Sequence, residues 1–359
     1  MKKYNHFILI LLLLALTLSG CGGGNGGGGN PGGGSPGSGD PGGGNPGGGT
    51  TYTGVAFKMV SVPMVSSFPA GVDDKSSGSV TSAYSIAETE VTYELWSAVY
   101  AWATDRTATD SDTVPGHGQY TFGHAGLIGN DGSGGAKEPV TTISWHDAMV
   151  WCNALTEYYN AKGGTGYACV YCTDITYNTP IRTVVTTTGT YTIDSGEGSQ
   201  DNPCVNPIAR GFRLPTSNEW ELAARYIGDK NGDGDIRDSG EYYPGAYASG
   251  ADADYNDTTA TTDIDGDGDQ QIISDVAECA GRGTAEVKSK DPNKLGIYDM
   301  TGNVYEWCLD WYDSATRMLR GGCCSVSTNS VPYLRLGSTS GFGPAGTNFE
   351  VGFRFARTE

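Results

Sequence analysis

Apolar and polar positions alternate at the start of the folded part of the chain and then change to a helical spacing. Residues 57–63 alternate in this way, which predicts an opening strand. Between Trp96 and Ala103 the apolar side chains recur at the spacing of one helix face. Thr89 and Glu94 are residue types that favour a helix start, so this run predicts a first helix soon after the strand.

Two more helices are predicted further along the chain. Ala148, Cys152 and Leu155 fall on one helical stripe and predict the second helix. Thr216 is a favourable N-cap, and Glu219 three residues later completes a capping box, which predicts a third helix. The segments between these patterns are typical of insertions or long loops: residues 105–135, 160–207 and 228–290.

The N-terminus has the pattern of an export signal. Lys2 and Lys3 precede an apolar run over residues 7–18, which is shorter than the about 20 residues that a membrane-spanning helix needs. The Leu-Ser-Gly-Cys sequence that ends at Cys21 resembles the bacterial lipobox, which implies removal of residues 1–20 and lipidation of the Cys21 thiol. An uncleaved anchor helix is the alternative.

Lipidation would make the membrane the first partner of the mature chain. Each acyl CH₂ that enters the bilayer contributes about 0.8 kcal/mol, so several chains hold a protein firmly. Gly22 follows the cysteine, and the absence of an acidic residue there favours the outer membrane. The expected location is therefore the cell envelope, with the lipid-anchored chain on the outer membrane and facing the cell surface.

A low-complexity segment separates the anchor from the folded part. Residues 22–50 consist almost wholly of Gly, Pro, Ser and Asn, so they have no apolar surface to bury and are predicted to be disordered. A Gly-rich coil of this length reaches about 30 Å. Residues 21–50 are thus expected to form a lipidated tether, and residues 51–359 a single large domain, because no second linker interrupts them.

Composition narrows the range of partners and of cysteine chemistry. The net charge of −19 argues against nucleic acid, since neutralising phosphates requires Lys and Arg. Eight cysteines remain besides Cys21, and disulfides are permitted after export, although their roughly one hundred pairings stay open. Cys169 and Cys172 have CxxC spacing, but neither a second CxxC nor a spaced His pair accompanies them. A structural disulfide or buried thiols are expected there instead of zinc.

Four motifs occur in an order that is typical of one protein family. They are Arg-Leu-Pro-Thr with Glu-Trp-Glu-Leu-Ala-Ala-Arg (213–225), Gly-Ile-Tyr-Asp-Met-Thr-Gly-Asn-Val-Tyr-Glu-Trp (296–307), Arg-Gly-Gly (320–322) and Gly-Phe-Arg (352–354). In this order they resemble the formylglycine-generating-enzyme-like (sulfatase-modifying factor) family. The resemblance implies an α+β, C-type-lectin-like fold of the formylglycine-generating-enzyme type, loop-rich with insertions and with mostly antiparallel sheets.

The residues that the resemblance assigns to catalysis are missing. Catalytic members carry a redox-active cysteine pair that activates oxygen, and the two positions correspond to Val326 and Val331. The thiolate is the nucleophile and metal ligand in such chemistry, and valine has none. Cys323 and Cys324 lie nearby, but neighbouring side chains on a strand point to opposite faces. We therefore expect no catalytic residue and no catalytic metal; an oxygen- and copper-dependent cysteine-oxidising enzyme that uses Cys323 or Cys324 is the alternative.

The C-terminal segment, about 320–354, instead resembles the variable region of proteins diversified by retroelements. Its mixture of Ser, Gly and Asn offers adaptable hydrogen bonding, and Tyr and Phe offer rigid contact area, as in antibody loops. The resemblance implies a diversified ligand-binding face on a surface-displayed lipoprotein that binds a protein or another surface ligand. A non-variable adhesive or structural lipoprotein is a further alternative. The candidate face positions are Ser325, Val326, Ser327, Asn329, Tyr333, Ser338, Ser340, Gly341, Phe342, Gly343, Gly346, Asn348, Phe349 and Glu350.

Calcium is the one metal that the resemblance implies. The family's ligands correspond to Asp299, the carbonyls of Gly302 and Val304, and Glu306, all of which are oxygen donors of the kind that calcium prefers. The alternative is a buried turn in which Glu306 caps backbone groups.

Two acidic loops form a separate candidate for calcium. Residues 229–236 have the opening of an EF-hand loop, but the twelfth position is Gly240 and Glu241 comes one residue late. Residues 263–269 repeat the acidic pattern without a terminal glutamate. Solvated surface loops are the alternative for both.

Overall fold

The structure, a computed structural model, describes residues 52–359 except 188, 255–258, 269, 280–282 and 326–330. The chain divides into two compact units, residues 1–41 and 42–359, and every described residue belongs to the second. The predicted signal peptide and tether lie outside the described residues. Within the described part of the chain, no helix is both long enough and apolar enough to cross a membrane.

Capping groups define the three main helices. The second helix, α2 (Trp145–Ala161), starts from a capping box of Ser144 and Asp147. The third, α3 (Ser217–Arg225), starts from the predicted box of Thr216 and Glu219, which is confirmed. The first helix, α1 (Tyr93–Thr104), begins four residues after Thr89, because the side chain of Thr92 accepts the hydrogen bond from the Leu95 amide. Thr89 instead donates to the Glu90 carbonyl.

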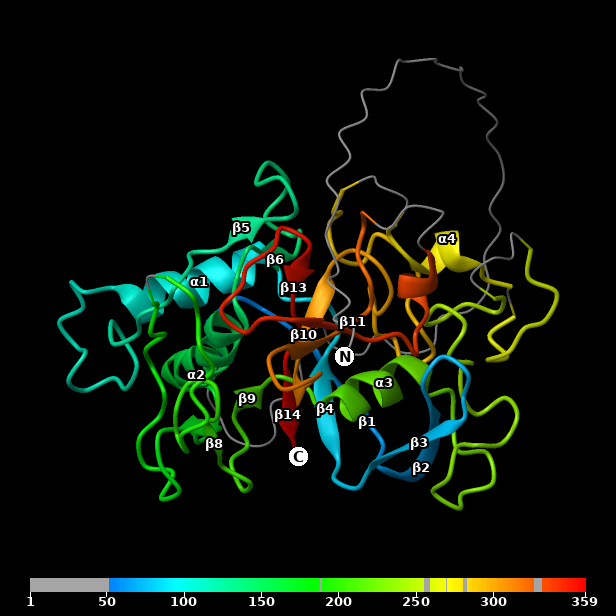
Figure 1. The fold of residues 1–359 in the computed structure, drawn as a ribbon, viewed down its shortest axis with the longest axis horizontal. Helices are drawn as coiled ribbons and strands as arrows, with labels where there is room; N and C mark the ends of the chain where they lie inside the picture. The colour runs from blue at the N-terminus through cyan, green and yellow to red at the C-terminus, as the bar shows by residue number, and fades with distance from the viewer. Residues whose placement is uncertain (1–51, 188, 255–258, 269, 280–282, 326–330) are drawn as a thin grey trace, which may run out of the picture. The chain divides into compact units, whose positions relative to one another are not determined.

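Two four-stranded sheets form the centre of the fold. The first has the order β1-β4-β14-β9 and is antiparallel throughout: β1 (Met59–Val62), β4 (Tyr84–Ala87), β14 (Ala356–Thr358) and β9 (Phe212–Arg213). The last strand therefore lies between strands from the first and middle thirds of the chain (Figure 1). The predicted strand over 57–63 is confirmed in its centre, as β1.

The second sheet has the order β12-β11-β10-β13. Its strands are β12 (Ser340–Phe342), β11 (Arg317–Arg320), β10 (Tyr305–Trp311) and β13 (Val351–Gly352). The pairing of β10 with β13 is parallel, and the other two pairings are antiparallel. Figure 1 shows β13 in red beside β10 in orange.

Short elements occupy the rest of the described chain, including the three predicted insertions. Antiparallel hairpins are β2 (Val65–Ala70) with β3 (Ser76–Val80), β5 (Leu127–Ile128) with β6 (Val140–Thr141), and β7 (Tyr171–Cys172) with β8 (Cys204–Val205). The short helices are α4 (Ile273–Val276) and the 3-10 helix η1 (Val331–Leu334). The described parts of 105–135, 160–207 and 228–290 are thus mostly irregular, as predicted.

Aromatic side chains from distant motifs form the main core. Trp96 of α1 stacks on Trp151 of α2 with ring centroids 5.6 Å apart, and Phe353 packs edge-on against Trp151 at 5.4 Å. All three side chains are fully buried. The aromatic residue of the Gly-Phe-Arg motif is therefore a core residue, and truncating such a side chain typically costs about 3–5 kcal/mol.

We expect Asp147→Ala to destabilise the domain by about 2–4 kcal/mol, because the buried Asp147 carboxylate accepts hydrogen bonds from several groups. They include the amides of Gly123, His124 and Ser144, and the His124 ring. Urea unfolding would measure the loss. Asp131→Ala is the matched control, since Asp131 is exposed and accepts hydrogen bonds from Ser133 in its own turn; it should change stability by less than about 0.5 kcal/mol.

The Asp147 carboxylate also makes the stability of the domain depend on pH. Burial opposes ionisation, but the hydrogen bonds from His124 and Ser144 outweigh it and lower the pKa of Asp147. A carboxyl group whose pKa is lower in the folded state stabilises the fold at pH values above its unfolded-state pKa, which is about 4. This stabilisation is lost as the pH falls through the folded-state pKa. The difference between wild type and Asp147→Ala should therefore shrink below about pH 4. An unchanged difference at low pH would contradict this assignment.

Candidate functional site

The described positions of the predicted ligand-binding face lie in η1, in β12 and in the loops before β13. Where the structure describes them, none of its positions is buried: Tyr333 and Phe349 are 49% and 51% exposed, and Ser325 is exposed. The partly buried positions are Ser338, Ser340, Gly341, Phe342, Gly343, Gly346, Asn348 and Glu350. Val326, Ser327 and Asn329 lie outside the described residues.

Backbone groups of fixed elements hold this segment in place. The amide of Trp145, at the start of α2, donates to the Pro344 carbonyl at 3.1 Å, and the Thr142 amide donates to the Asn348 carbonyl at 3.1 Å. The Tyr305 amide of β10 donates to the Glu350 carbonyl at 2.8 Å. Because these bonds use main-chain carbonyls, they place the face without requiring any particular side chain on it.

Arg320, the first residue of the Arg-Gly-Gly motif, ties the face to α3. Its buried guanidinium donates to the Ser217 hydroxyl and to the Glu221 carboxylate at 2.6 and 2.7 Å. A third donor reaches the Ser338 carbonyl at 3.3 Å. Arg320 thus connects α3 to the loop between η1 and β12, and its contact with the face is again a main-chain carbonyl.

The face positions differ in how freely they could change. Phe342 stacks on the buried Trp307 with centroids 5.9 Å apart and belongs to the margin of the main core. A Cβ at Gly341 would lie 2.4 Å from the Thr316 hydroxyl oxygen, so any larger residue there would force neighbouring atoms to move. At Gly343, by contrast, a Cβ would meet none of the described atoms within 4 Å. The sequence offers no reason to distinguish these positions, but their packing in the structure differs.

The described part of the face has a small hollow. The hollow has a volume of about 0 Å³ that a water-sized sphere could occupy, and Tyr305, Tyr333 and Ser338 are among the residues that line it. Pockets for small molecules measure roughly 300–1,000 Å³. The geometry of the face is thus better suited to another surface than to a small molecule.

Burial disfavours thiolate chemistry at the two cysteines beside the face. Cys323 and Cys324 are both buried, and burial raises the pKa of Cys324 to about 12. Burial and the nearby Glu350 carboxylate also raise the pKa of Cys323. Val331, one of the two positions that carry the redox cysteines in catalytic relatives, opens η1, and Val326 lies outside the described residues.

A buried acidic cluster lies behind the face, around the Arg354 guanidinium. Arg354 donates to both oxygens of Glu306 at 2.7 Å, and the Trp220 indole also donates to Glu306 at 2.7 Å. The buried Glu90 accepts from the Asn303 side chain and the Val304 amide. No motif in the sequence marks Glu90, because its partners lie more than 200 positions away along the chain.

The cluster has more carboxyl groups than one guanidinium can balance, which disfavours their ionised forms. Burial, together with Asp299 and Glu306, raises the pKa of Glu90 well above its usual range. Burial likewise raises the pKa of Asp299 to about 6. The Asp299 Oδ2 atom accepts from the Lys288 amide, and its Oδ1 atom is buried without a hydrogen-bond partner among the described residues.

The calcium ligands implied by the resemblance fit this cluster in part. Asp299 has an unsatisfied oxygen in an acidic surrounding, as a cation site requires. Positive φ angles at Asp299 and Gly302 shape the turn that carries the two carbonyls, of Gly302 and Val304. Glu306, however, is already paired with Arg354 and Trp220. Calcium at this turn therefore stays a prediction, with Asp299 and the two carbonyls as the residues that would hold it.

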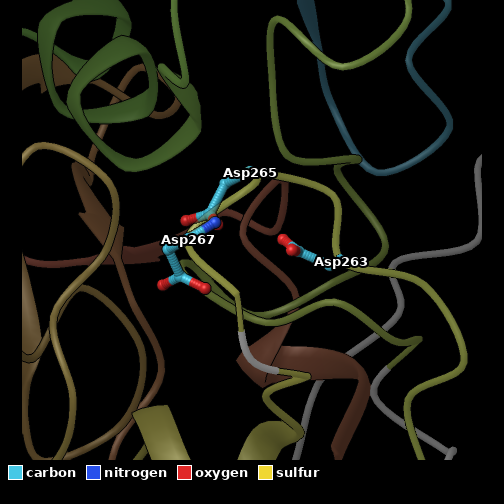
Figure 2. A group of neighbouring side chains, drawn as sticks. All are labelled: Asp263, Asp265 and Asp267. Carbon is cyan, nitrogen blue, oxygen red and sulfur yellow. The ribbon is translucent and has the colours of Figure 1, made fainter.

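The two acidic loops differ in how closely their carboxylates approach one another. Asp263, Asp265 and Asp267 each offer a carboxylate oxygen, and these oxygens lie within 4.8 Å of one another (Figure 2). In the loop that opens at Asp229, the Glu241 carboxylate accepts from the Lys230 amide at 2.7 Å, although Glu241 comes one residue late for an EF-hand. Calcium in these loops also stays a prediction.

The CxxC pair is not part of a metal cluster. Across the described residues, the Asp263 group alone brings three or more potential ligands together. Cys169 and Cys172 are buried thiols, and the Cys169 sulfur contacts the Asn153 carbonyl at 3.7 Å. The choice between a structural disulfide and buried thiols at these positions stays a prediction.

The fold and these motifs define a domain of the formylglycine-generating-enzyme-like class. The family model described as "Sulfatase-modifying factor enzyme 1-like domain" matches residues 48–359, so the chain belongs to this family. The α+β, loop-rich architecture is the C-type-lectin-like fold of that family, as the sequence predicted.

A solved structure supports the resemblance to variable proteins. Treponema denticola variable protein 1 superposes with a TM-score of 0.54 and 26% identity, over 86% of this chain and 98% of that one. A chaperone protein, LppX, from Paenibacillus barcinonensis is 28% identical over 253 residues, which are 65% of this chain and 75% of the relative.

Relatives with and without catalytic names occur in the same family. The formylglycine-generating enzyme of Streptomyces coelicolor is 29% identical over 41% of this chain and 46% of its own length. The inactive Cα-formylglycine-generating enzyme 2 of Bos taurus is 32% identical over 41% of this chain and 44% of its own length. The chain thus spans less than half of either relative, and family membership alone does not decide between catalysis and binding.

Proposed function

We propose that this chain is a surface-displayed lipoprotein whose C-terminal face binds a protein or another surface ligand without catalysis. One observation carries the proposal: main-chain hydrogen bonds hold the face, while its described side chains are exposed or only partly buried. Such a surface can change the side chains at its open positions, such as Gly343 and Phe349, with little effect on folding. The shallow hollow and the exposed Tyr333 and Phe349 favour a macromolecular partner.

Programmed variation of the face is part of this proposal. Its support is the composition of the segment about 320–354 and the similarity to Treponema denticola variable protein 1. Lipid attachment at Cys21 would display the domain on the cell envelope, on the outer membrane, through the tether of residues 22–50. The net charge of −19 supports a partner other than nucleic acid.

Sequencing the surrounding DNA tests the variation. We expect a nearly identical repeat of the segment that differs at adenines, next to a reverse-transcriptase gene, and we expect differences between isolates to concentrate at the face positions. Differences spread evenly along residues 51–359, without such a repeat, would favour the non-variable adhesive lipoprotein instead.

The absence of catalysis gives the second test. We expect the purified chain, incubated with copper, oxygen and a sulfatase-motif peptide, to form no aldehyde, because both redox positions are valines and the nearby thiols are buried and protonated. A catalytic relative serves as the positive control, and mass spectrometry of the peptide is the readout. Aldehyde that forms with wild type and disappears with Cys323→Ser or Cys324→Ser would support the enzyme alternative.

A further inference from the structure

Two cysteines face each other across the hairpin at the base of the second insertion. In the antiparallel pair of β7 and β8, Cys172 is the register partner of Cys204. Both side chains are buried, and both are thiols in the structure. In a hairpin of this kind, directly opposed residues place their side chains on the same face of the sheet.

The backbone separation suits a disulfide bond. The Asn206 amide donates to the Val170 carbonyl at 2.8 Å, two positions before Cys172 in the same register. Hydrogen-bonded pairs alternate along such a ladder, so Cys172 and Cys204 also form a hydrogen-bonded pair, with Cα atoms about 5.5 Å apart. Disulfides join Cα atoms at about 4.4–6.8 Å, a range that includes this value. Their Cβ atoms lie about 3.5–4.5 Å apart, closer than the about 4.5–5.5 Å of an unlinked cross-strand pair, so the two side chains must move together when the bond forms.

The competing pairing within the CxxC is less favourable. Cys169 lies before β7 and outside the pairing of β7 with β8, whereas Cys172 lies within that pairing. The Cys169 sulfur points to the Asn153 carbonyl of α2, at 3.7 Å. The spacing that stood out in the sequence is therefore incidental, and the partner of Cys172 lies 32 positions downstream.

We propose that Cys172 and Cys204 form a disulfide bond in the mature protein. The pairing is independent of what the face binds, but its formation in the cell rests on the proposed export to an oxidising compartment. Each thiol loses its proton and one S–S bond forms. The two electrons pass by thiol–disulfide exchange to the disulfide of a protein oxidant, which leaves as a dithiol.

The bond would close a loop that supports the second sheet. The segment between the two cysteines contains Asp201, whose carboxylate pairs with His146 of α2 at 2.8 Å. The Asp201 carbonyl accepts from Arg317 of β11, the strand that pairs with β12 beneath the face. Closing the loop at its base keeps this contact in place. Burial raises the pKa of Cys172 to about 11, so uncatalysed exchange is slow and an oxidant enzyme is needed.

Peptide mapping of the full chain tests the proposal in two arms. In the first, the chain is expressed with its own N-terminus, trapped with an alkylating agent during lysis and digested without reductant; the Cys172 peptide should be linked to the Cys204 peptide. In the second, the reduced full chain is oxidised in vitro with glutathione disulfide and an oxidoreductase, which needs no export. Fragmentation of the linked peptides locates the bond.

Matched variants distinguish the possible pairs. Cys169→Ser should keep the bond to Cys204, and Cys172→Ser should abolish it. Reduction should lower the Tm of wild type by about 5 °C, but should leave the Cys172→Ser/Cys204→Ser double variant unchanged.

The two arms distinguish a wrong disulfide pairing from a protein that is not exported. A bond that forms in vitro but is absent from cells would overturn its occurrence in the mature protein and, with an unlipidated Cys21, would argue against export as well. Free thiols at both positions in both arms, or a bond between Cys169 and Cys172, would overturn the pairing itself.

Discussion

Replacing Arg354 with alanine should cost about 3–5 kcal/mol of unfolding free energy, the largest effect that we expect from a single polar substitution. The guanidinium is fully buried and donates to both oxygens of Glu306. It also donates to the carbonyls of Ala87, Tyr298 and Asp299. Its removal would leave the Glu306 carboxylate buried beside two further acids, Glu90 and Asp299.

Lysine at this position should rescue only part of the loss. A single ammonium group cannot donate to the two Glu306 oxygens and the three carbonyls from one plane, as a guanidinium does. Urea unfolding followed by tryptophan fluorescence is the measurement. Lys58→Ala is the control, since Lys58 is exposed and pairs with Glu88, and it should cost less than about 1 kcal/mol. If Arg354→Ala lowers the unfolding free energy by less than about 1 kcal/mol, the role assigned to the buried ion pair is wrong.

Randomising the open face positions should leave most variants folded. Ser325, Tyr333, Gly343 and Phe349 are exposed or have free space for a side chain. Substitutions at such sites usually change stability by no more than about 0.5 kcal/mol each. Protease resistance of a displayed library, read by sequencing, would measure the folded fraction, and we expect more than about half of the members to survive.

A matched core library gives the contrast. Leu319, Leu334, Val351 and Phe353 come from the same part of the chain but are buried. Each large-to-small change there costs about 2–5 kcal/mol, and four such changes exceed the whole stability of a typical domain. Fewer than about a tenth of these variants should resist the protease. Equal depletion of both libraries would mean that folding depends on the face, and the variable-face proposal would fail.

Local signals in the sequence were sufficient for the helices and for the family. The capping box of Thr216 and Glu219 lies within four residues, so its geometry follows from neighbours along the chain. The start of α1 was predicted too early, because Thr89 and Thr92 are equally good caps by type. Only the path of the chain gives Thr92 the hydrogen bond from the Leu95 amide.

The candidate site shows the limit of the same reasoning. Phe342 and Phe349 are the same residue type in the same segment, and the sequence assigned both to the face. The structure stacks Phe342 on Trp307 and leaves Phe349 half exposed. Composition cannot separate them, because exposure depends on a strand pairing between β11 and β12 and on a tryptophan more than thirty positions away.

The sequence by itself determined the family and the helix caps, since each depends on residue identity or on neighbours a few positions apart. The tertiary structure alone decided which face positions are open, that Glu90 joins Arg354 and Glu306, and that Cys204 opposes Cys172. These relations join residues between 32 and more than 200 positions apart. Such contacts form when sheets and helices pack together, and no local pattern encodes which partners meet.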